Sequence, residues 1–255
     1  MISGIRVVLG RDLRTFFTDF YGIGFRTLEL LLQTVIFAYV LTSVVPSSEI
    51  GGLTYLQFFA LGSLITSVFW ASYEIGRDVY WDRDSGYLNY LMALPLSRSE
   101  VVVGRMLGGS TRGIITVLPL FALAGILVPT SLVNIVESVG LLFTFAMGIC
   151  GISITINLLL REEVRSRLLS TLLSLLLIRS STALYPSVAM PVWLQMGTKL
   201  NPVTYAADAI RIITIQNSDA AFPLGSVSFV LLFTAAAALI GSWLFSKSVE
   251  GGPTQ

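Results

Sequence analysis

The chain has 255 residues, of which 54% are hydrophobic and only 12% are charged, and its formal net charge is +1. Soluble domains carry about 25% charged residues, so this composition excludes an ordinary water-soluble protein and indicates an integral membrane protein. The basic residues border apolar stretches and do not form one patch, so no nucleic-acid partner is expected.

Residues 5–20 are predicted to form an amphipathic helix on the membrane surface. Arg11, Arg14 and Thr18 fall on its polar side, where arginines can approach anionic headgroups while the opposite side enters the acyl boundary. The alternative is a soluble helix packed on a cytosolic partner. The apolar side carries Ile5, Val8, Leu9, Leu13, Phe16, Phe17 and Phe20.

Six apolar stretches of about 20 residues follow, the length that a bilayer requires. They predict an all-α integral membrane protein with six transmembrane helices in a single transmembrane domain over residues 1–255. The expected spans are Thr27–Val45, Leu53–Ile75, Met106–Val128, Val139–Leu160, Leu168–Tyr185 and Gly225–Phe245.

The fifth stretch is the weakest of these spans, because it reaches Arg179 soon after it begins. A charge near the bilayer centre costs about 2.5–3.5 kcal/mol. Arg179 is therefore expected to face protein, a water-filled path or the outer headgroups. A place on a substrate path and simple snorkelling are equal alternatives.

Most of the 16 Lys and Arg residues fall into every second gap between the apolar stretches. Cytoplasmic loops retain Lys and Arg, so this bias predicts a multi-pass protein of the cell (cytoplasmic) membrane with both termini in the cytoplasm. The residues on that side are Arg6, Arg11, Arg14, Arg26, Arg77, Arg83, Arg98, Arg105, Arg112, Arg161, Arg165, Arg167 and Lys247.

Residues 76–105 form a cytoplasmic loop that is too patterned for a simple connector. Its apolar residues recur at helical spacing from Tyr87 to Leu94, which predicts a short helix with an exposed apolar side. Ser97 and Glu100 match a capping box that starts the next helix. The short helix suits docking in a groove of another protein, and the alternative is a helix lying on the headgroups. The candidate docking residues are Asp82, Arg83, Gly86, Tyr87, Leu88, Leu91, Leu94 and Pro95.

Residues 186–224 form a long outer loop with room for two short helices that dip into the membrane edge, a re-entrant hairpin. Asn201 is predicted to cap a helix whose first turn holds Pro202. Asp208 and Arg211 are spaced to pair on one side of it; the alternative is a soluble outer loop. The residues of interest are Pro186, Pro191, Asn201, Pro202, Tyr205, Asp208 and Arg211.

Several kinds of chemistry are missing from this sequence. It has no histidine, which removes His-based acid–base catalysis and His-ligated zinc, and no carboxylate pair lies in the middle of a span. The run G-S-W-L-F-S-K-S at residues 241–248 resembles a phosphate-binding loop only superficially, since it ends an apolar span. We therefore expect no catalytic residue, no metal and no nucleotide site on this chain.

Two segments resemble the membrane (permease) subunit of type-2 ATP-binding-cassette (ABC) transporters of the exporter-like class. The run D-R-D-S-G-Y-L-N-Y-L-M-A-L-P-L-S-R at residues 82–98 looks like that family's D-R-E-x-G-T-L-E-x-L-x-x-x-P-x-S-R region. Residues 185–211 look like its F-P…L-P…N-P-L-T-Y-x-x-x-x-x-R region. The likeness covers nearly the whole chain, with a departure at Arg179-Ser180-Ser181-Thr182, where the family often has a small turn.

The resemblance implies that two permease subunits and two separate ATPase subunits form one exporter. ATP and Mg would then bind the ATPases, the Tyr87–Leu94 helix would contact them, and an amphipathic substrate such as a drug, lipid or lipid-linked glycan would pass at the permease dimer interface among membrane lipids. The rival interpretations are an ATP-independent secondary transporter or channel and, with less support, a membrane-embedded lipid enzyme. The near absence of midplane charge disfavours the first, and the lack of grouped catalytic residues disfavours the second.

Overall fold

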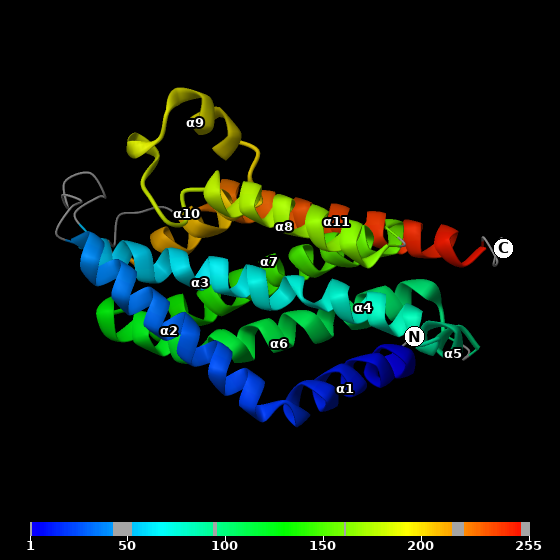
Figure 1. The fold of residues 1–255 in the computed structure, drawn as a ribbon. Coiled ribbons are helices and arrows are strands. Elements are labelled where there is room, and N and C mark those ends of the chain that lie inside the picture. Colours follow the sequence, from blue (N-terminus) through cyan, green and yellow to red (C-terminus); the bar gives the residue numbers. More distant parts are fainter. Residues whose placement is uncertain (1, 43–52, 94–95, 161, 216–221, 251–255) are drawn as a thin grey trace.

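The computed structural model describes residues 2–42, 53–93, 96–160, 162–215 and 222–250, and every regular element in these ranges is helical (Figure 1). The all-α fold predicted from the sequence is therefore confirmed. The helices are α1 (Ile2–Thr18), α2 (Phe20–Thr42), α3 (Tyr55–Tyr73), α4 (Ile75–Asp84), α5 (Tyr87–Ala93), α6 (Arg98–Leu127), α7 (Leu132–Leu159), α8 (Glu163–Arg179), the short 3-10 helix η2 (Ser187–Ala189), α9 (Val192–Thr198), α10 (Pro202–Thr214) and α11 (Leu224–Glu250).

The long helices lie side by side, and the start of α1 and the end of α11 lie at the same end of the bundle (Figure 1). We call this end of the bundle, which also carries α5, the terminal end. The opposite end, where α10 lies, is the far end. In the described residues five helices are long and apolar enough to cross a membrane, and their bounds are Tyr21–Val40, Tyr55–Asp84, Arg98–Leu127, Leu132–Leu159 and Leu224–Phe245.

The fifth predicted span, Leu168–Tyr185, is not among these five. The helix in that region is α8, which begins earlier and ends at Arg179 after 17 residues. At 1.5 Å per residue it is about 25 Å long, less than the ~30 Å hydrocarbon core. The helix ends because the chain turns at Ser180, where the Asn201 amide donates a hydrogen bond to the Leu177 carbonyl in its last turn.

Residues 76–84, expected to begin a loop, are instead helical. No proline lies between Tyr73 and Ser85, and α4 continues from α3 with only a local adjustment at Glu74. The first true break comes at Gly86, whose φ of 75° is the only positive φ among the described residues. Glycine adopts this left-handed conformation without steric penalty, so α5 starts directly after it.

The main core lies between α3, α6, α7 and α10. Large side chains from α3 and α7, including Phe69 and Phe145, are completely buried there. Helix α10 enters this core with small side chains, among them Ala206 and Ala207, that let neighbouring helices approach closely. Of the two short helices expected between residues 186 and 224, α10 thus packs inside the bundle, whereas α9 projects from its side (Figure 1).

Candidate functional site

Four charged side chains near the terminal end join α1, α4 and α6. Arg11 donates to both carboxylate oxygens of Asp82, with N–O distances of 2.8 and 2.6 Å. Arg105 pairs with Asp82 and, at 3.2 Å, with Asp12. We call Arg11, Asp12, Asp82 and Arg105 the charge cluster.

The charge cluster is largely withdrawn from solvent. The side chain of Arg105 is 3% exposed and that of Asp12 is 4% exposed. Burial raises the pKa of the Asp12 carboxyl above its usual range, although Arg105 and Arg11 oppose this shift. Buried charges of this kind require their partners, because a charge left alone in such a place costs several kcal/mol. The cluster therefore fixes the three helices relative to one another.

Helix α5 is held against this region. The Arg11 guanidinium lies 3.9 Å from the centre of the Tyr87 ring, a cation–π contact that joins α1 to the start of α5. Leu91 is only 1% exposed and packs in a cluster with Val79 and Met106. Arg83 donates to carbonyl oxygens at the end of α7, that of Leu160 at 3.1 Å.

The prediction of an exposed apolar side on this helix is therefore wrong for Leu91. The α4 and α6 residues around it supply the apolar partner that the sequence pattern requires but does not identify. The exposed side of α5 instead presents Tyr90, which is 59% exposed. The side chain of Leu88 and both Leu94 and Pro95 lie outside the described residues.

At the far end, the predicted capping residue ties α10 to α8. The Asn201 side chain accepts from the backbone N–H of Val203 at 2.9 Å, which confirms the predicted cap, and Pro202 occupies the first turn. The Asn201 amide also donates to the Leu177 carbonyl at 2.6 Å and to the Ser180 hydroxyl at 3.1 Å. One side chain thus starts α10 and binds the end of α8.

Arg211 occupies a buried position beneath the same turn. It donates to the Ala183 carbonyl at 2.7 Å and lies 3.6 Å from the centre of the Phe58 ring. The predicted pair with Asp208 is confirmed at 3.4 Å, and Thr182 donates to the same carboxylate at 2.8 Å. These contacts hold the segment after α8 against α3 and α10.

The remaining motif residues of this region play supporting parts. The Tyr205 ring stacks on Phe229 with centroids 4.0 Å apart, which links α10 to α11. Pro186 and Pro191 directly precede η2 and α9, where the fixed φ of proline favours a helix start. The predicted motif of residues 186–211 is thus mainly a scaffold for the far end.

We expect Asn201→Ala to lower the free energy of unfolding by about 1–2 kcal/mol, because it removes the cap of α10 and the amide that binds α8. Thermal unfolding of the purified protein in detergent measures this loss. Asn201→Asp is the matched control, since its carboxylate keeps the cap but cannot donate to Leu177, and an intermediate loss is expected. Equal stability of all three proteins would contradict the tie between α8 and α10.

Two cavities lie between α3 or α4 on one side and α8 on the other, and Trp70 lines both. The cavity nearer the terminal end has a volume of about 190 Å³ and includes Arg77 and Arg167. The cavity nearer the far end has a volume of about 270 Å³, also contacts α2, and includes Arg179. We call the two together the lateral groove.

The lateral groove has a mixed lining of aromatic and hydroxyl side chains. Arg179, predicted to face protein, a water-filled path or the outer headgroups, lines this groove. Sequence analysis missed the polar residues around it. The sequence feature that could have identified them is a set of hydroxyl side chains at helical spacing within the apolar stretches, because such spacing places them on one face of a span. These residues are Ser63, Thr66 and Ser67 on α3 and Ser166, Ser170 and Thr171 on α8.

Sequence analysis also did not identify Asp12 and Arg105 as partners, because they belong to different helices. In the described residues no group of three or more His, Cys, Asp or Glu side chains could hold a metal ion. The carboxylates of the charge cluster are bound by arginines. The charge cluster is suited to mechanical coupling between helices, and the lateral groove is suited to binding a ligand.

Comparison of the sequence with known proteins finds a matching family. Residues 3–215 match the model of the ABC-2 type transporter family. A protein named as transport permease ycf38 in Cyanophora paradoxa is 35% identical over 168 residues, which cover 64% of this chain and 58% of that protein. The protein of the same name in Porphyra purpurea is 27% identical over 215 residues, covering 77% of this chain and 72% of that protein.

Proposed function

Because this chain belongs to the ABC-2 type transporter family, and is thus a multi-pass transport permease subunit, we propose that it serves an ATP-driven exporter. It would form the substrate path as a dimer and work with separate ATPase subunits, which bind ATP and Mg. The expected substrate is amphipathic. Both termini and α5 would face the cytoplasm at the cell membrane, in agreement with the bias of basic residues.

The observation that carries this proposal is the way α5 is held. The charge cluster and the Arg11–Tyr87 contact bind α5 to α1, α4 and α6, while Tyr90 remains exposed at the terminal end. A rigidly held helix with one exposed aromatic residue can transmit a push from a docked partner to the spans. A loosely attached helix would absorb the same movement.

Exposed polar residues support a dimeric path. Glu29 and Gln33 lie one helical turn apart on an exposed side of α2, within a predicted span, and Gln33 lines the lateral groove. Polar groups at this depth face protein or water, because exposure to hydrocarbon is costly. A second copy placed against this side would cover them and close the groove into a path. With α8 added to the five long apolar helices, each subunit would have six spans, which would complete the permease domain.

We expect Tyr90→Asp to weaken the association with the ATPase about tenfold or more, since aromatic residues at interface centres often contribute over 1 kcal/mol. The measurement is co-purification with the ABC ATPase encoded nearest to this chain's gene, together with ATP-dependent export. Expression and detergent extraction should stay normal, because Tyr90 is exposed. Tyr90→Phe is the matched control and should retain the partner.

Retention of the ATPase and of export by Tyr90→Asp would show that α5 is not the coupling surface. Substrate export by this chain alone in purified vesicles, without ATPase, would instead support a secondary transporter. Leu91→Asp serves a different purpose: because Leu91 is buried, it should reduce the amount of folded protein, and it cannot be used to test docking.

A further inference from the structure

We propose that the lateral groove accepts amphipathic molecules with an anionic headgroup. This inference rests on the proposed function, since it names the substrate class of the same path. It is carried by the charges and the polar lining of the groove.

The charges of the groove are predominantly positive. Among the described residues that line it, the charged ones are Glu74, Arg77, Arg167 and Arg179. The single carboxylate, Glu74, is bound by Arg26 from α2 and lies 3.4 Å from Arg77. A cationic headgroup would therefore find no unoccupied carboxylate among these residues, whereas an anion would meet the guanidinium group of Arg179.

Arg179 has the position of a headgroup site. It ends α8 at the far end of the groove, and its backbone carbonyl accepts from the Tyr185 hydroxyl, which fixes the local chain direction. No carboxylate among the described residues pairs with its guanidinium. An arginine beside an apolar path that has no carboxylate partner among the described residues is suited to a phosphate or carboxylate supplied by a ligand.

The rest of the groove suits the apolar part of such a molecule. Phe37, Phe59 and Trp70 supply aromatic walls, and hydroxyl groups of α3 give weaker polar contacts. An anionic headgroup at Arg179 thus lies at the far end of the groove, while its chain lies against these aromatic side chains.

Trp70 provides a local reporter, because it lines both cavities. The experiment uses the full chain in detergent with Trp81, Trp193 and Trp243 replaced by Phe, which leaves one of the four tryptophans. Brominated phosphatidic acid and phosphatidylcholine with the same brominated chains are compared as quenchers of Trp70. They differ in net charge but share the phosphate and the chains.

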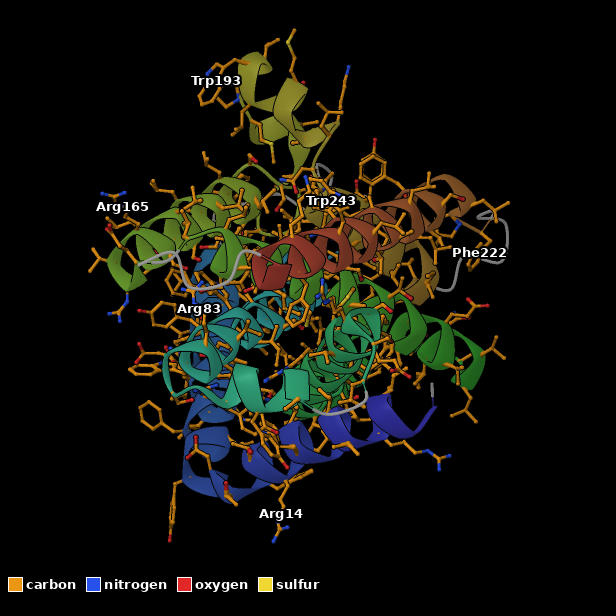
Figure 2. All side chains as sticks on the ribbon, turned by 90° about the vertical axis from the view of Figure 1, so that its right-hand side faces the viewer. Arg14, Arg83, Arg165, Trp193, Phe222 and Trp243 are labelled. Atoms are coloured by element: carbon orange, nitrogen blue, oxygen red, sulfur yellow. The ribbon has the colours of Figure 1, made fainter. Side chains whose placement is uncertain are left out.

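We expect phosphatidic acid to quench Trp70 at about a fivefold lower mole fraction than phosphatidylcholine, a factor equivalent to about 1 kcal/mol. Arg179→Gln should remove this preference and Arg179→Lys should retain most of it. Arg14→Gln is the matched control, because Arg14 points away from the bundle on the side opposite α9 (Figure 2). It should leave the preference unchanged.

Equal quenching by the two lipids, or a preference that survives Arg179→Gln, would overturn the inference. An equal effect of Arg14→Gln would also overturn it, since it would indicate general attraction of anionic lipid to the protein surface. The assay needs no ATPase. A preserved preference with no ATP-dependent export would therefore count against the proposed function alone, and export without the preference would count against the anionic substrate class alone.

Discussion

Asp82→Asn is expected to lower the free energy of unfolding by about 3 kcal/mol, because it removes a carboxylate that two arginines share. Arg105 would stay buried with Asp12 as its remaining carboxylate partner in the charge cluster. Arginine cannot lose its proton to relieve this cost. Thermal unfolding in detergent measures the change, and the loss should appear as a lower melting temperature and a lower yield of folded protein.

Asp84→Asn is the matched control for this experiment. Asp84 lies on the same helix, two residues away, but it is exposed. Its substitution should change stability by no more than about 0.5 kcal/mol. If the two variants were equally stable, the charge cluster would not hold α1, α4 and α6 together. Since α5 is attached through the same cluster, Asp82→Asn should also reduce ATP-dependent export under the proposed function.

The second large effect is expected for Gly62→Ala in α3. A Cβ atom at this position would overlap the Ala183 carbonyl oxygen and lie 2.9 Å from Nη2 of Arg211. The first contact is with backbone, so a simple side-chain rotation cannot relieve it. Helix α3 would have to move away from the segment after α8 and weaken the hydrogen bond from Arg211 to Ala183. We expect a loss of about 3 kcal/mol or more in the free energy of unfolding.

Gly125→Ala is the matched substitution for Gly62→Ala. A Cβ at Gly125 in α6 would have no neighbouring atom of the described residues within 4 Å, so the position is open. Alanine has a higher helix propensity than glycine by up to about 1 kcal/mol, and this variant should be neutral or slightly more stable. Thermal unfolding of both variants would decide the matter, and a Gly62→Ala protein as stable as the wild type would show that α3 does not approach Ala183 so closely.

The charge cluster and Gly62 illustrate two different ways in which this bundle is fixed. At the terminal end, buried ion pairs connect three helices and carry α5. At the far end, Gly62 has no side chain and therefore lets the backbone of α3 approach Ala183 closely. Arg211 and Asn201 donate hydrogen bonds to backbone carbonyls in the same region. The lateral groove lies between these two fixed ends, beside α8, which makes few contacts with the other helices.

Local features of this chain follow from its sequence because their causes lie within a few residues. Apolar stretches of bilayer length predict five helices that the structure contains. The Ser97–Glu100 capping box and the Asn201 cap form as expected, since each needs only neighbouring backbone N–H groups. The Asp208–Arg211 pair forms because residues three apart share one side of a helix.

Only the tertiary structure decides which distant groups meet. Arg11 and Asp82 are 71 residues apart, and nothing near either of them indicates the other. A stripe of apolar residues on α5 shows that one side will be covered, but not whether this chain or a partner covers it, and here Leu91 packs within the chain. Helix α8 ends where Asn201 binds the Leu177 carbonyl, a contact made across the turn by another helix. Hydropathy and spacing determine helices and caps because these are local, whereas ion pairs, close backbone approaches and exposed faces depend on how the helices pack.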